Sequence, residues 1–301
     1  MKLPKFTISQ FHKLFPDDAA CLEHLFQQFH SKSACPKCGL IGQYYRQKKT
    51  AHYVCYCGKS QISPKAGTIF EKSSTDLVKW FHAIFLMSQS RNGVAAKEIE
   101  RQVGVTYKTA WRMAKEIRKM MNEEPALQSG EVEADETWIG GKRNMRHKME
   151  NKSIVFGSVQ RKGKVHAEVV KDTTEESLLH PIRNNIAKGS VLLTDELRAY
   201  KSITNVEGLG HATVKHKEKQ YRKGGAYTNT IEGFWSQLKR SLDGTYHVIS
   251  AKYLPLYLGE FSFRYNYAHS ADQHLFHFLL SRVGLPHVLV SQRIGACRYF
   301  D

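Results

Sequence analysis

Three acidic residues occupy positions at which a carboxylate needs a chemical reason. Asp135 lies within a predicted strand, EVEADETWIG, and Asp195 ends the short apolar strand SVLLTD. Glu232 falls in the first turns of a predicted helix, NTIEGFWSQLKR. An unpaired buried charge is costly, and binding of a divalent metal can offset that cost. Three carboxylates that converge from separate elements can hold two Mg²⁺ or Mn²⁺ ions about 3.5–4 Å apart, which supports in-line displacement at a phosphodiester.

Each of these acids also has an ordinary structural explanation. Asp135 is flanked by three nearby glutamates and can belong to an acidic strand edge. Asp195 can cap a following helix, and Glu232 can interact favourably with the dipole of its own helix. The joint arrangement is more specific. Three strands, a helix and a fourth strand, with acids on the first and fourth strands and a third acid on a later helix, are what a ribonuclease H-like α/β domain with a mixed sheet requires.

Four of the six cysteines cluster between residues 35 and 57. Cys35 and Cys38 form a turn of the zinc-knuckle type, and the pair Cys55 and Cys57 begins seventeen residues after Cys38. Four thiolates at this spacing can hold a structural Zn²⁺, which would supply folding energy that so small a segment lacks. Zinc ribbons usually have Cys-x-x-Cys as the second pair, so His52 is an alternative ligand. Four ordinary reduced cysteines are the plain alternative.

The segment VAAKEIERQVGVTYKTAWRMAKEIRK predicts two short helices joined by a tight turn. Gly104 falls where the turn needs it, and Thr106 can cap the second helix. The second helix would turn a polar and basic face outward, which suits the major groove of duplex DNA. The residues of that face are Tyr107, Lys108, Arg112 and Lys115. The alternative is an ordinary helical hairpin with a solvated basic face.

The charge balance indicates the same class of partner. Lysine and arginine total 45 against 28 aspartates and glutamates, which gives +17 over 301 residues with neutral histidines. A chain this basic favours a polyanion or an anionic membrane surface. No apolar run approaches the roughly 20 residues that cross a bilayer, and the N-terminus lacks the pattern of a secretory signal. We therefore expect a cytoplasmic, nucleoid-associated protein, and exclude secreted, integral membrane and fibrous classes.

The length of the chain leaves room for two or three domains at roughly 100–200 residues each. We expect a multidomain α+β protein whose main boundary is the polar linker at residues 122–130. The expected parts are an N-terminal helical segment (1–30), a zinc ribbon (31–70), a helix-turn-helix region (73–122), the ribonuclease H-like catalytic domain (130–275) and a C-terminal tail (276–301).

Three long motifs carry a resemblance to a known family. The runs NTIEGFWSQLKRSLDGTYHVIS, EADETWIGGKR and GTIFEKSSTDLVKWFHAIFLM closely resemble the IS1595-type (ISXO2-like) transposases of prokaryotic insertion sequences. The resemblance covers nearly the whole chain and implies a ribonuclease H-like DDE transposase fold. By motif, Asp135, Asp195 and Glu232 match the three catalytic acids. Thirty-six residues lie between the last two, a spacing typical of DDE enzymes.

The resemblance also implies an activity and its partners. The ribbon and the helix-turn-helix would recognise the terminal inverted repeats of the element in double-stranded DNA. The acids, with two Mg²⁺ or Mn²⁺ ions, would cleave the 3′ ends and transfer them to target DNA. At least a dimer is implied on DNA, because two ends must be held together. Lys239 lies seven residues after Glu232 on the same helical face, where such transposases often place a basic residue against DNA.

The chain departs from the family pattern at two places, and two other functions stay open. The second cysteine pair is one residue short, and Tyr227 stands where the family commonly has histidine. A non-catalytic DNA-binding regulator, or an inactive transposase copy, would keep the ribbon, the helix-turn-helix and the charge. A ribonuclease H-like nuclease without strand transfer is a third alternative. The three acids separate these alternatives, because a regulator has no need of them.

Overall fold

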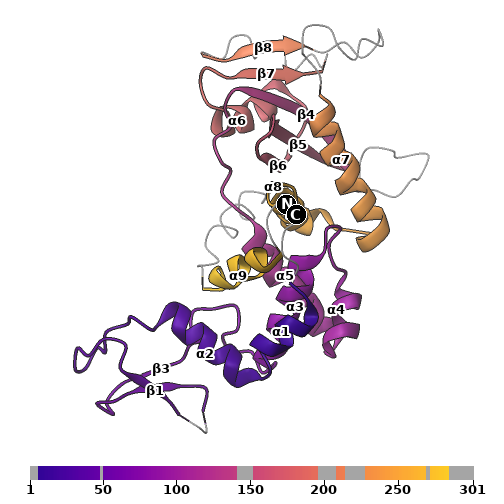
Figure 1. Ribbon diagram of the computed structural model, residues 1–301. Coiled ribbons are helices and arrows are strands. Elements are labelled where there is room, and N and C mark those ends of the chain that lie inside the picture. Colours follow the sequence, from indigo (N-terminus) through magenta and orange to yellow (C-terminus); the bar gives the residue numbers. More distant parts are fainter. Residues whose placement is uncertain are drawn as a thin grey trace. The chain divides into compact units, whose positions relative to one another are not determined.

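The chain folds into two compact units. The structure, a computed structural model, describes residues 6–47, 50–140, 152–195, 208–213, 228–268 and 272–284. Unit 1 comprises Met1–Ser90, Val94–Met120 and His269–Asp301, and unit 2 comprises Arg91–Gly93 and Met121–Ala268 (Figure 1). The division after Met120 falls at the start of the expected polar linker. Within the described ranges, no helix is long and apolar enough to cross a membrane.

Unit 1 is built from helices around an aromatic core, with a small sheet attached. Its helices are α1 (Ile8–Leu14), α2 (Asp18–Phe29), α3 (Leu77–Gln89), α4 (Ala96–Val103), α5 (Tyr107–Met121) and α9 (Asp272–Ser281). The sequence predicts one N-terminal helix, but the structure has two. Asp17 caps α2 by accepting from the Ala20 amide. Phe11 of α1 is almost fully buried, and its ring lies 5.2 Å from that of Phe85.

The C-terminal helix α9 belongs to unit 1. Its Phe276, Leu279 and Leu280 are fully buried, and the Phe276 ring contacts the Phe11 ring at a centroid distance of 5.9 Å. The sequence predicts a catalytic domain that extends to residue 275, with a tail after it. The structure instead places the apolar face of α9 in the core of unit 1, so the chain returns to unit 1 after unit 2.

The small sheet of unit 1 contains the cysteine pairs at one end. Its strands are β1 (Tyr44–Arg46), β2 (Tyr53–Cys55) and β3 (Gln61–Ile62), paired antiparallel in the order β1-β2-β3. One face packs on α2, where the Tyr53 and Phe26 rings stack in parallel at 3.9 Å. The Tyr53 hydroxyl also donates to Glu23. The opposite face of the sheet carries Tyr45, which is exposed.

Unit 2 is a five-stranded mixed sheet. Its strands are β4 (Glu131–Ile139), β5 (Ser153–Gln160), β6 (Val165–Val170), β7 (Val191–Thr194) and β8 (Gly210–Thr213), and the spatial order is β6-β5-β4-β7-β8 (Figure 1). Strands β4, β5 and β6 pair antiparallel, whereas β7 runs parallel to β4 and β8 parallel to β7. The predicted succession of three strands, a helix and a fourth strand is present.

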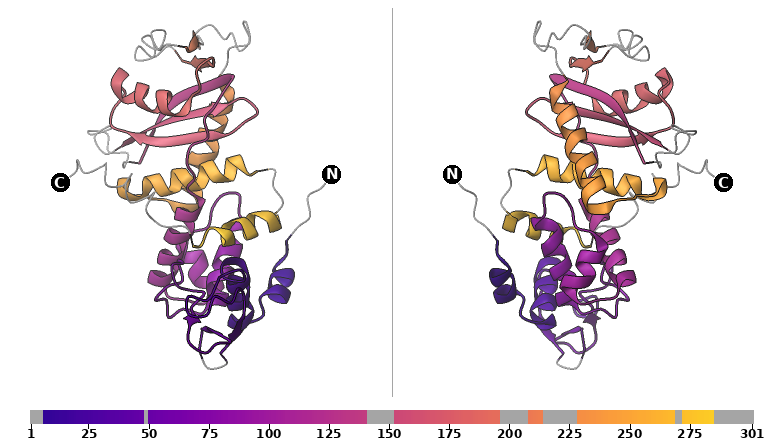
Figure 2. Two further views of the ribbon diagram at one scale, coloured as in Figure 1. Left: turned by 90° about the vertical axis from the view of Figure 1, so that its left-hand side faces the viewer. Right: turned by 90° about the vertical axis from the view of Figure 1, so that its right-hand side faces the viewer.

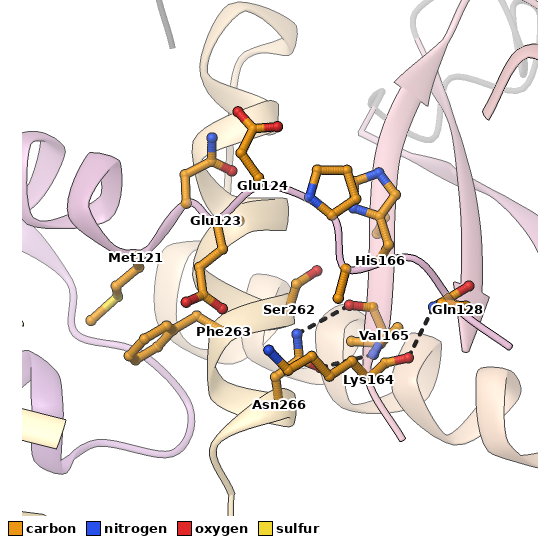
Figure 3. A pocket seen from close by; sticks show the side chains of 15 residues that line it. Met121, Glu123, Glu124, Gln128, Lys164, Val165, His166, Ser262, Phe263 and Asn266 are labelled. Atoms are coloured by element: carbon orange, nitrogen blue, oxygen red, sulfur yellow. Dashed lines mark hydrogen bonds between the residues drawn. The ribbon is translucent and has the colours of Figure 1, made fainter. Parts of the chain in front are cut away.

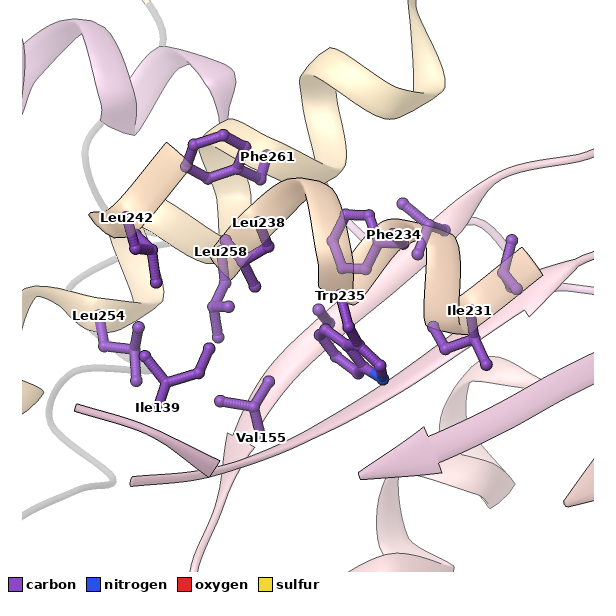
Figure 4. Close-up of a cluster of buried hydrophobic side chains, with 13 residues drawn as sticks. Ile139, Val155, Ile231, Phe234, Trp235, Leu238, Leu242, Leu254, Leu258 and Phe261 are labelled. Carbon is purple, nitrogen blue, oxygen red and sulfur yellow. The ribbon is translucent and has the colours of Figure 1, made fainter. Parts of the chain in front are cut away.

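Two hydrophobic clusters cover the two faces of this sheet. On one face, α6 (Glu175–Asn185) packs on Val132, Ala134 and Phe156. On the other face lie α7 (Asn229–Ser241), orange in Figure 2, and α8 (Leu254–Asn266), whose apolar side chains meet Ile139 and Val155 (Figures 2 and 4). A π-helical turn (Leu242–Tyr246) and a 3₁₀ turn (Ala251–Tyr253) join α7 to α8. Because side chains alternate along a strand, the odd-numbered positions of β4 face α7.

Candidate functional site

The sheet brings two of the three predicted acids together. Asp135 lies on the central strand β4, and Asp195 directly follows β7, the parallel neighbour of β4. Glu133 is paired with Leu193 across these strands, so the register carries Asp135 toward Asp195. Among the described residues, one carboxylate oxygen each of Asp135, Asp195 and Glu136 lies within 4.8 Å of the others. Oxygen ligands at such separations fit a hard divalent cation such as Mg²⁺.

The third predicted acid stands beside this group. Glu232 lies in the first turn of α7, is exposed, and accepts a hydrogen bond from the Thr228 hydroxyl at 3.1 Å. It is not one of the carboxylates within 4.8 Å of each other, but its charge acts on Asp135. Lys239 is exposed in the last turn of the same helix.

The electrostatics of Asp135 are those of a crowded acidic site. The pKa of this carboxyl is raised to about 6, chiefly by burial, next by the charge of Asp195 and least by that of Glu232. Hydrogen bonds to the carboxylate, including one from Trp235, oppose this rise only in part. A bound cation would oppose this shift, because an opposite charge favours the ionised form of the carboxyl group.

A buried glutamate two residues before Asp135 holds the start of α7. Glu133 is fully buried, and its Oε2 accepts from the backbone amides of Thr230 and Ile231 at 2.8 and 3.1 Å. Its Oε1 accepts from the Thr230 hydroxyl at 2.8 Å and from Arg161 Nε at 3.1 Å. Thr228, the N-cap residue, makes no capping hydrogen bond with its side chain. Glu133 therefore satisfies the free amides of the helix from the neighbouring strand.

The indole of Trp235 links α7 to Asp135. Its Nε1 donates to Asp135 Oδ2 at 3.0 Å, and the side chain is buried in the α7 cluster (Figure 4). Gly157 lies directly opposite Asp135 on β5. A Cβ atom at Gly157 would come within 2.5 Å of the indole ring, so only glycine leaves room for the ring to reach the carboxylate.

The end of β7 is held by a neighbouring histidine. The Thr194 hydroxyl donates to the Asp195 carbonyl at 3.1 Å and contacts His211 Nε2 at 2.8 Å. The Thr194 hydroxyl and His211 Nε2 share one proton in this contact, and the tautomer of the ring decides which of them donates. Burial lowers the pKa of His211, so the neutral ring is favoured near neutral pH. These bonds fix the backbone from which Asp195 projects.

The four cysteines of the small sheet also form one cluster. Their sulfurs lie within 4.8 Å of one another, with Cys35 Sγ 3.7 Å from Cys57 Sγ and Cys38 Sγ 3.6 Å from Cys55 Sγ. A tetrahedral zinc with bonds of about 2.3 Å requires sulfur separations of about 3.8 Å. The Cys-x-Cys pair therefore supplies both of its thiols, and His52 is not a member of the cluster.

Thiolate character is favoured at the first of these cysteines. Burial acts to raise the pKa of Cys35, but hydrogen bonds from backbone amides, including that of Lys37, outweigh burial and lower the pKa to about 6. Such amide bonds to sulfur are what a turn of the zinc-knuckle type provides, and they suit a thiolate ligand.

The four residues predicted to face DNA on α5 differ in their surroundings. Tyr107 and Lys108 are exposed in the first turn, after Gly104 in the left-handed conformation that the turn requires. Arg112 donates to the Ser73 hydroxyl at 3.0 Å, and its guanidinium lies over the Trp80 ring. Lys115, the fourth of these residues, is half-buried and lies over the ring of Trp111.

A cavity in unit 2 contains none of the predicted site residues (Figure 3). It encloses about 30 Å³ beside β6, the edge strand of the sheet. Asn266 accepts from the Val165 amide at 2.8 Å and donates to the Val165 carbonyl at 3.2 Å, while Gln128 donates to the Lys164 carbonyl at 2.9 Å. These side chains satisfy backbone groups that an edge strand leaves open, so the cavity is part of the scaffold.

The residues that support the acids were not singled out by the sequence patterns. Glu133 counts there only as a flanking acid, although period-two alternation puts it on the same face of β4 as Asp135. That periodicity is the signal that could have found Glu133. Nothing local marks Gly157 or His211, because their roles depend on strand register. Tyr227, where the family commonly has histidine, lies outside the described residues.

Two solved structures show low overall similarity to this chain. A simian T-cell lymphotropic virus intasome in complex with PP2A regulatory subunit B56 gamma is 15% identical, with a TM-score of 0.32 over 65% of this chain and 74% of that chain. The HTLV-2 integrase catalytic core domain in complex with magnesium is 14% identical, with a TM-score of 0.29 over 46% and 86%. Both TM-scores lie below 0.5, so they support no assignment by themselves.

Sequence relatives are more informative. A protein of Halobacterium salinarum described as uncharacterized in transposable element ISH50 is 24% identical over 250 residues, which are 76% of this chain and 84% of that protein. An uncharacterized transposase-like protein of Haemophilus influenzae is 30% identical over 105 residues, 35% of this chain and 83% of that protein. Residues 128–266, which contain all three predicted acids, match the ISXO2-like transposase domain. The chain therefore belongs to the IS1595-type, ISXO2-like transposase family.

Proposed function

We propose that unit 2 is a ribonuclease H-like DDE domain that cleaves DNA at the 3′ ends of an insertion sequence and joins those ends to target DNA. The observation that carries this proposal is the pairing of Asp135 on β4 with Asp195 at the end of the parallel strand β7. Their carboxylates lie close enough for one cation to bind both. Two acids held together on adjacent strands, with a raised pKa at one of them, are hard to explain as surface charges.

The residues of this chain have separate tasks in that reaction. Asp135, Asp195 and Glu232 would hold the metal ions. The chemistry that bound Mg²⁺ or Mn²⁺ supplies is activation of the attacking water or 3′-hydroxyl and stabilisation of the leaving oxygen. Glu133 positions α7 and with it Glu232, and Trp235 orients the Asp135 carboxylate through its hydrogen bond.

Glu136 joins the acidic group without having been expected there. It is buried, and one of its carboxylate oxygens lies within 4.8 Å of those of Asp135 and Asp195. Its carboxylate oxygen is a further candidate ligand for a cation bound by this group. Glu232 completes the proposed set of ligands from α7, on the same face of the sheet as Asp135.

Unit 1 would bind the terminal inverted repeats. Tyr107 and Lys108 are exposed at the start of α5, where a recognition helix contacts base edges and phosphates. Zinc held by the four cysteines would stabilise the small sheet. Lys239 is exposed on α7 and would contact a phosphate near the acids. Because strand transfer needs two ends of DNA held together, the active form would be at least a dimer on DNA.

The test uses the protein with DNA fragments from the two ends of its own element. Labelled fragments are incubated with the full chain in Mg²⁺ or Mn²⁺, and nicking at the 3′ end and joining to a target duplex are followed on gels. Asp135→Asn should abolish both products. The matched control is Asp172→Asn, a half-buried acid in the loop before α6, which should retain both.

The outcomes separate the alternatives. Nicking and joining by the wild type, both abolished in Asp135→Asn, support the transposase. Nicking without joining would identify a nuclease of the same fold. Tight, specific DNA binding with no cleavage in either metal would instead mean a regulator or an inactive copy, and the proposal would fail for this protein.

A further inference from the structure

The segment that carries the cysteines has an unusual charge composition. Residues 31–70 contain seven lysines and arginines and no aspartate or glutamate. The rest of the chain mixes both signs, since the whole protein has 28 acidic residues. Even with four thiolates bound to a divalent metal, this segment stays positive. A polyanion is the partner that such a surface attracts.

The small sheet in this segment has one covered face and one open face. The covered face includes Tyr53, which is 2% exposed and stacks on Phe26 of α2. The open face carries Tyr45, which is paired with Val54 across β1 and β2. Tyr56 lies in the turn directly after β2, and its ring contacts that of Tyr45.

The two tyrosines of the open face form an exposed aromatic pair. Tyr45 is 44% and Tyr56 67% exposed, and their ring centroids lie 5.3 Å apart at an interplanar angle of 54°. Ile41 is also 66% exposed in this segment. Lys37 and Lys59 are exposed in the two cysteine turns. Rings that pack against each other at the surface, among cations and without acids, have the composition of a surface that stacks on nucleobases.

The geometry favours unpaired over paired bases. In a duplex the base faces are already stacked, so protein rings reach them only where the strands separate. Small sheets with exposed aromatic side chains bind single strands by stacking bases on those rings. A duplex-binding surface would need the cations but not the ring pair.

We propose that the open face of this sheet, with Tyr45 and Tyr56, binds single-stranded DNA together with Lys37 and Lys59 of the two cysteine turns. The tyrosine rings stack on bases, and the two lysines contact phosphates. This site is separate from the acids on unit 2 and does not rest on their proposed function.

The test measures binding by the full-length, zinc-loaded protein in the absence of Mg²⁺, so that cleavage plays no part. Fluorescence anisotropy compares a labelled oligothymidine with a blunt duplex. The double variant Tyr45→Leu/Tyr56→Leu should bind oligothymidine about 10- to 100-fold more weakly, while its duplex affinity changes less than about 2-fold. The matched control Tyr45→Phe/Tyr56→Phe keeps both rings and should bind oligothymidine within about 2-fold of wild type.

The lysines give a second, independent readout. Lys37→Ala/Lys59→Ala should reduce the salt dependence of oligothymidine binding, by about 0.7 in the logarithmic slope for each phosphate that the variant no longer neutralises. Zinc content and circular dichroism confirm that each variant is folded, and Tyr56→Leu alone serves if the double variant releases zinc. Unchanged oligothymidine affinity in the leucine variants would overturn the proposal. So would an equal decrease in the leucine and phenylalanine variants, because the rings would then not be the cause.

Discussion

Replacing Glu133 by glutamine is expected to destabilise unit 2 far more than such a small change does elsewhere. Each carboxylate oxygen of Glu133 accepts two hydrogen bonds, one from the amides of Thr230 and Ile231 and the other from the Thr230 hydroxyl and Arg161. Glutamine replaces one acceptor oxygen with an NH₂ donor. Whichever way the amide turns, that donor faces other donors.

The magnitude follows from these contacts. Hydrogen bonds to a charged group contribute about 1.5–3 kcal/mol each, and a negative charge at a helix N-terminus contributes about 0.3–1 kcal/mol. Some acceptor function survives in glutamine, and the Thr230 hydroxyl can turn to accept. We therefore expect Glu133→Gln to lower the free energy of unfolding of unit 2 by about 2–4 kcal/mol. With a urea slope of about 2 kcal/mol per M, the midpoint of urea unfolding falls by roughly 1–2 M.

The assay must report unit 2 alone, because a chain with two units need not unfold in one step. Hydrogen exchange of peptides from β4 and α7, measured along a urea series, meets that need. The matched control is Glu131→Gln, which removes the other carboxylate that pairs with Arg161 but is 58% exposed. An exposed ion pair contributes about 0–1 kcal/mol. Equal effects of the two substitutions would refute the role assigned to Glu133.

Three further outcomes follow from the site. Gly157→Ala should displace the Trp235 indole, which would lie 2.5 Å from the added Cβ. We expect the free energy of unfolding of unit 2 to fall by about 1–3 kcal/mol and most of the cleavage activity to be lost. Normal activity with unchanged stability would contradict this expectation. Asp135→Asn should stabilise unit 2 in Mg²⁺-free buffer, by an amount that grows to about 3 kcal/mol as pH rises. The reason is that the folded pKa of about 6 exceeds the unfolded value of about 3.9, so ionisation costs stability progressively between these pH values and fully above them. Urea unfolding at pH 4, 5, 6 and 7 measures the difference in stability between the variant and the wild type. A difference that does not change with pH would contradict the role given to Asp135 ionisation. Cys57→Ser should remove bound zinc and expose the small sheet to proteolysis while leaving unit 2 protected; zinc retained through His52 would show that the cluster of four thiols is not the metal site.

Much of the acidic site could be predicted from the sequence because its signals are local. The β-branched residues of EVEADETWIG and the apolar run SVLLTD predicted strands that end on or contain an acid, and the structure has both strands. The clustered cysteines were likewise set apart by their spacing. In each case a few adjacent residues carry the whole pattern.

The features that escaped prediction depend on contacts between distant segments. The amides of Thr230 and Ile231 lie 97 and 98 residues from Glu133, so no local window shows that the glutamate caps α7. Helix α1 exposes Ile8 at one end and Leu14 at the other, which leaves too weak an apolar stripe for periodicity to detect. Helix α9 belongs to unit 1 because its buried Phe276 packs against Phe11, and the spacing of residues in the sequence does not reveal this contact.

Strand β4 carries both the glutamate that anchors α7 and one of the acids of the proposed metal site. Its even positions Val132 and Ala134 are buried against α6, while Glu133 and Asp135 face α7. One acid therefore fixes the helix that carries Glu232, and the next acid receives the hydrogen bond that the same helix sends back through Trp235. A shift of the register by one residue would exchange the two faces and break both interactions at once. The stability of this strand and the geometry of the acids are consequently one property, and substitutions that loosen α7 should impair cleavage even when every acid is present.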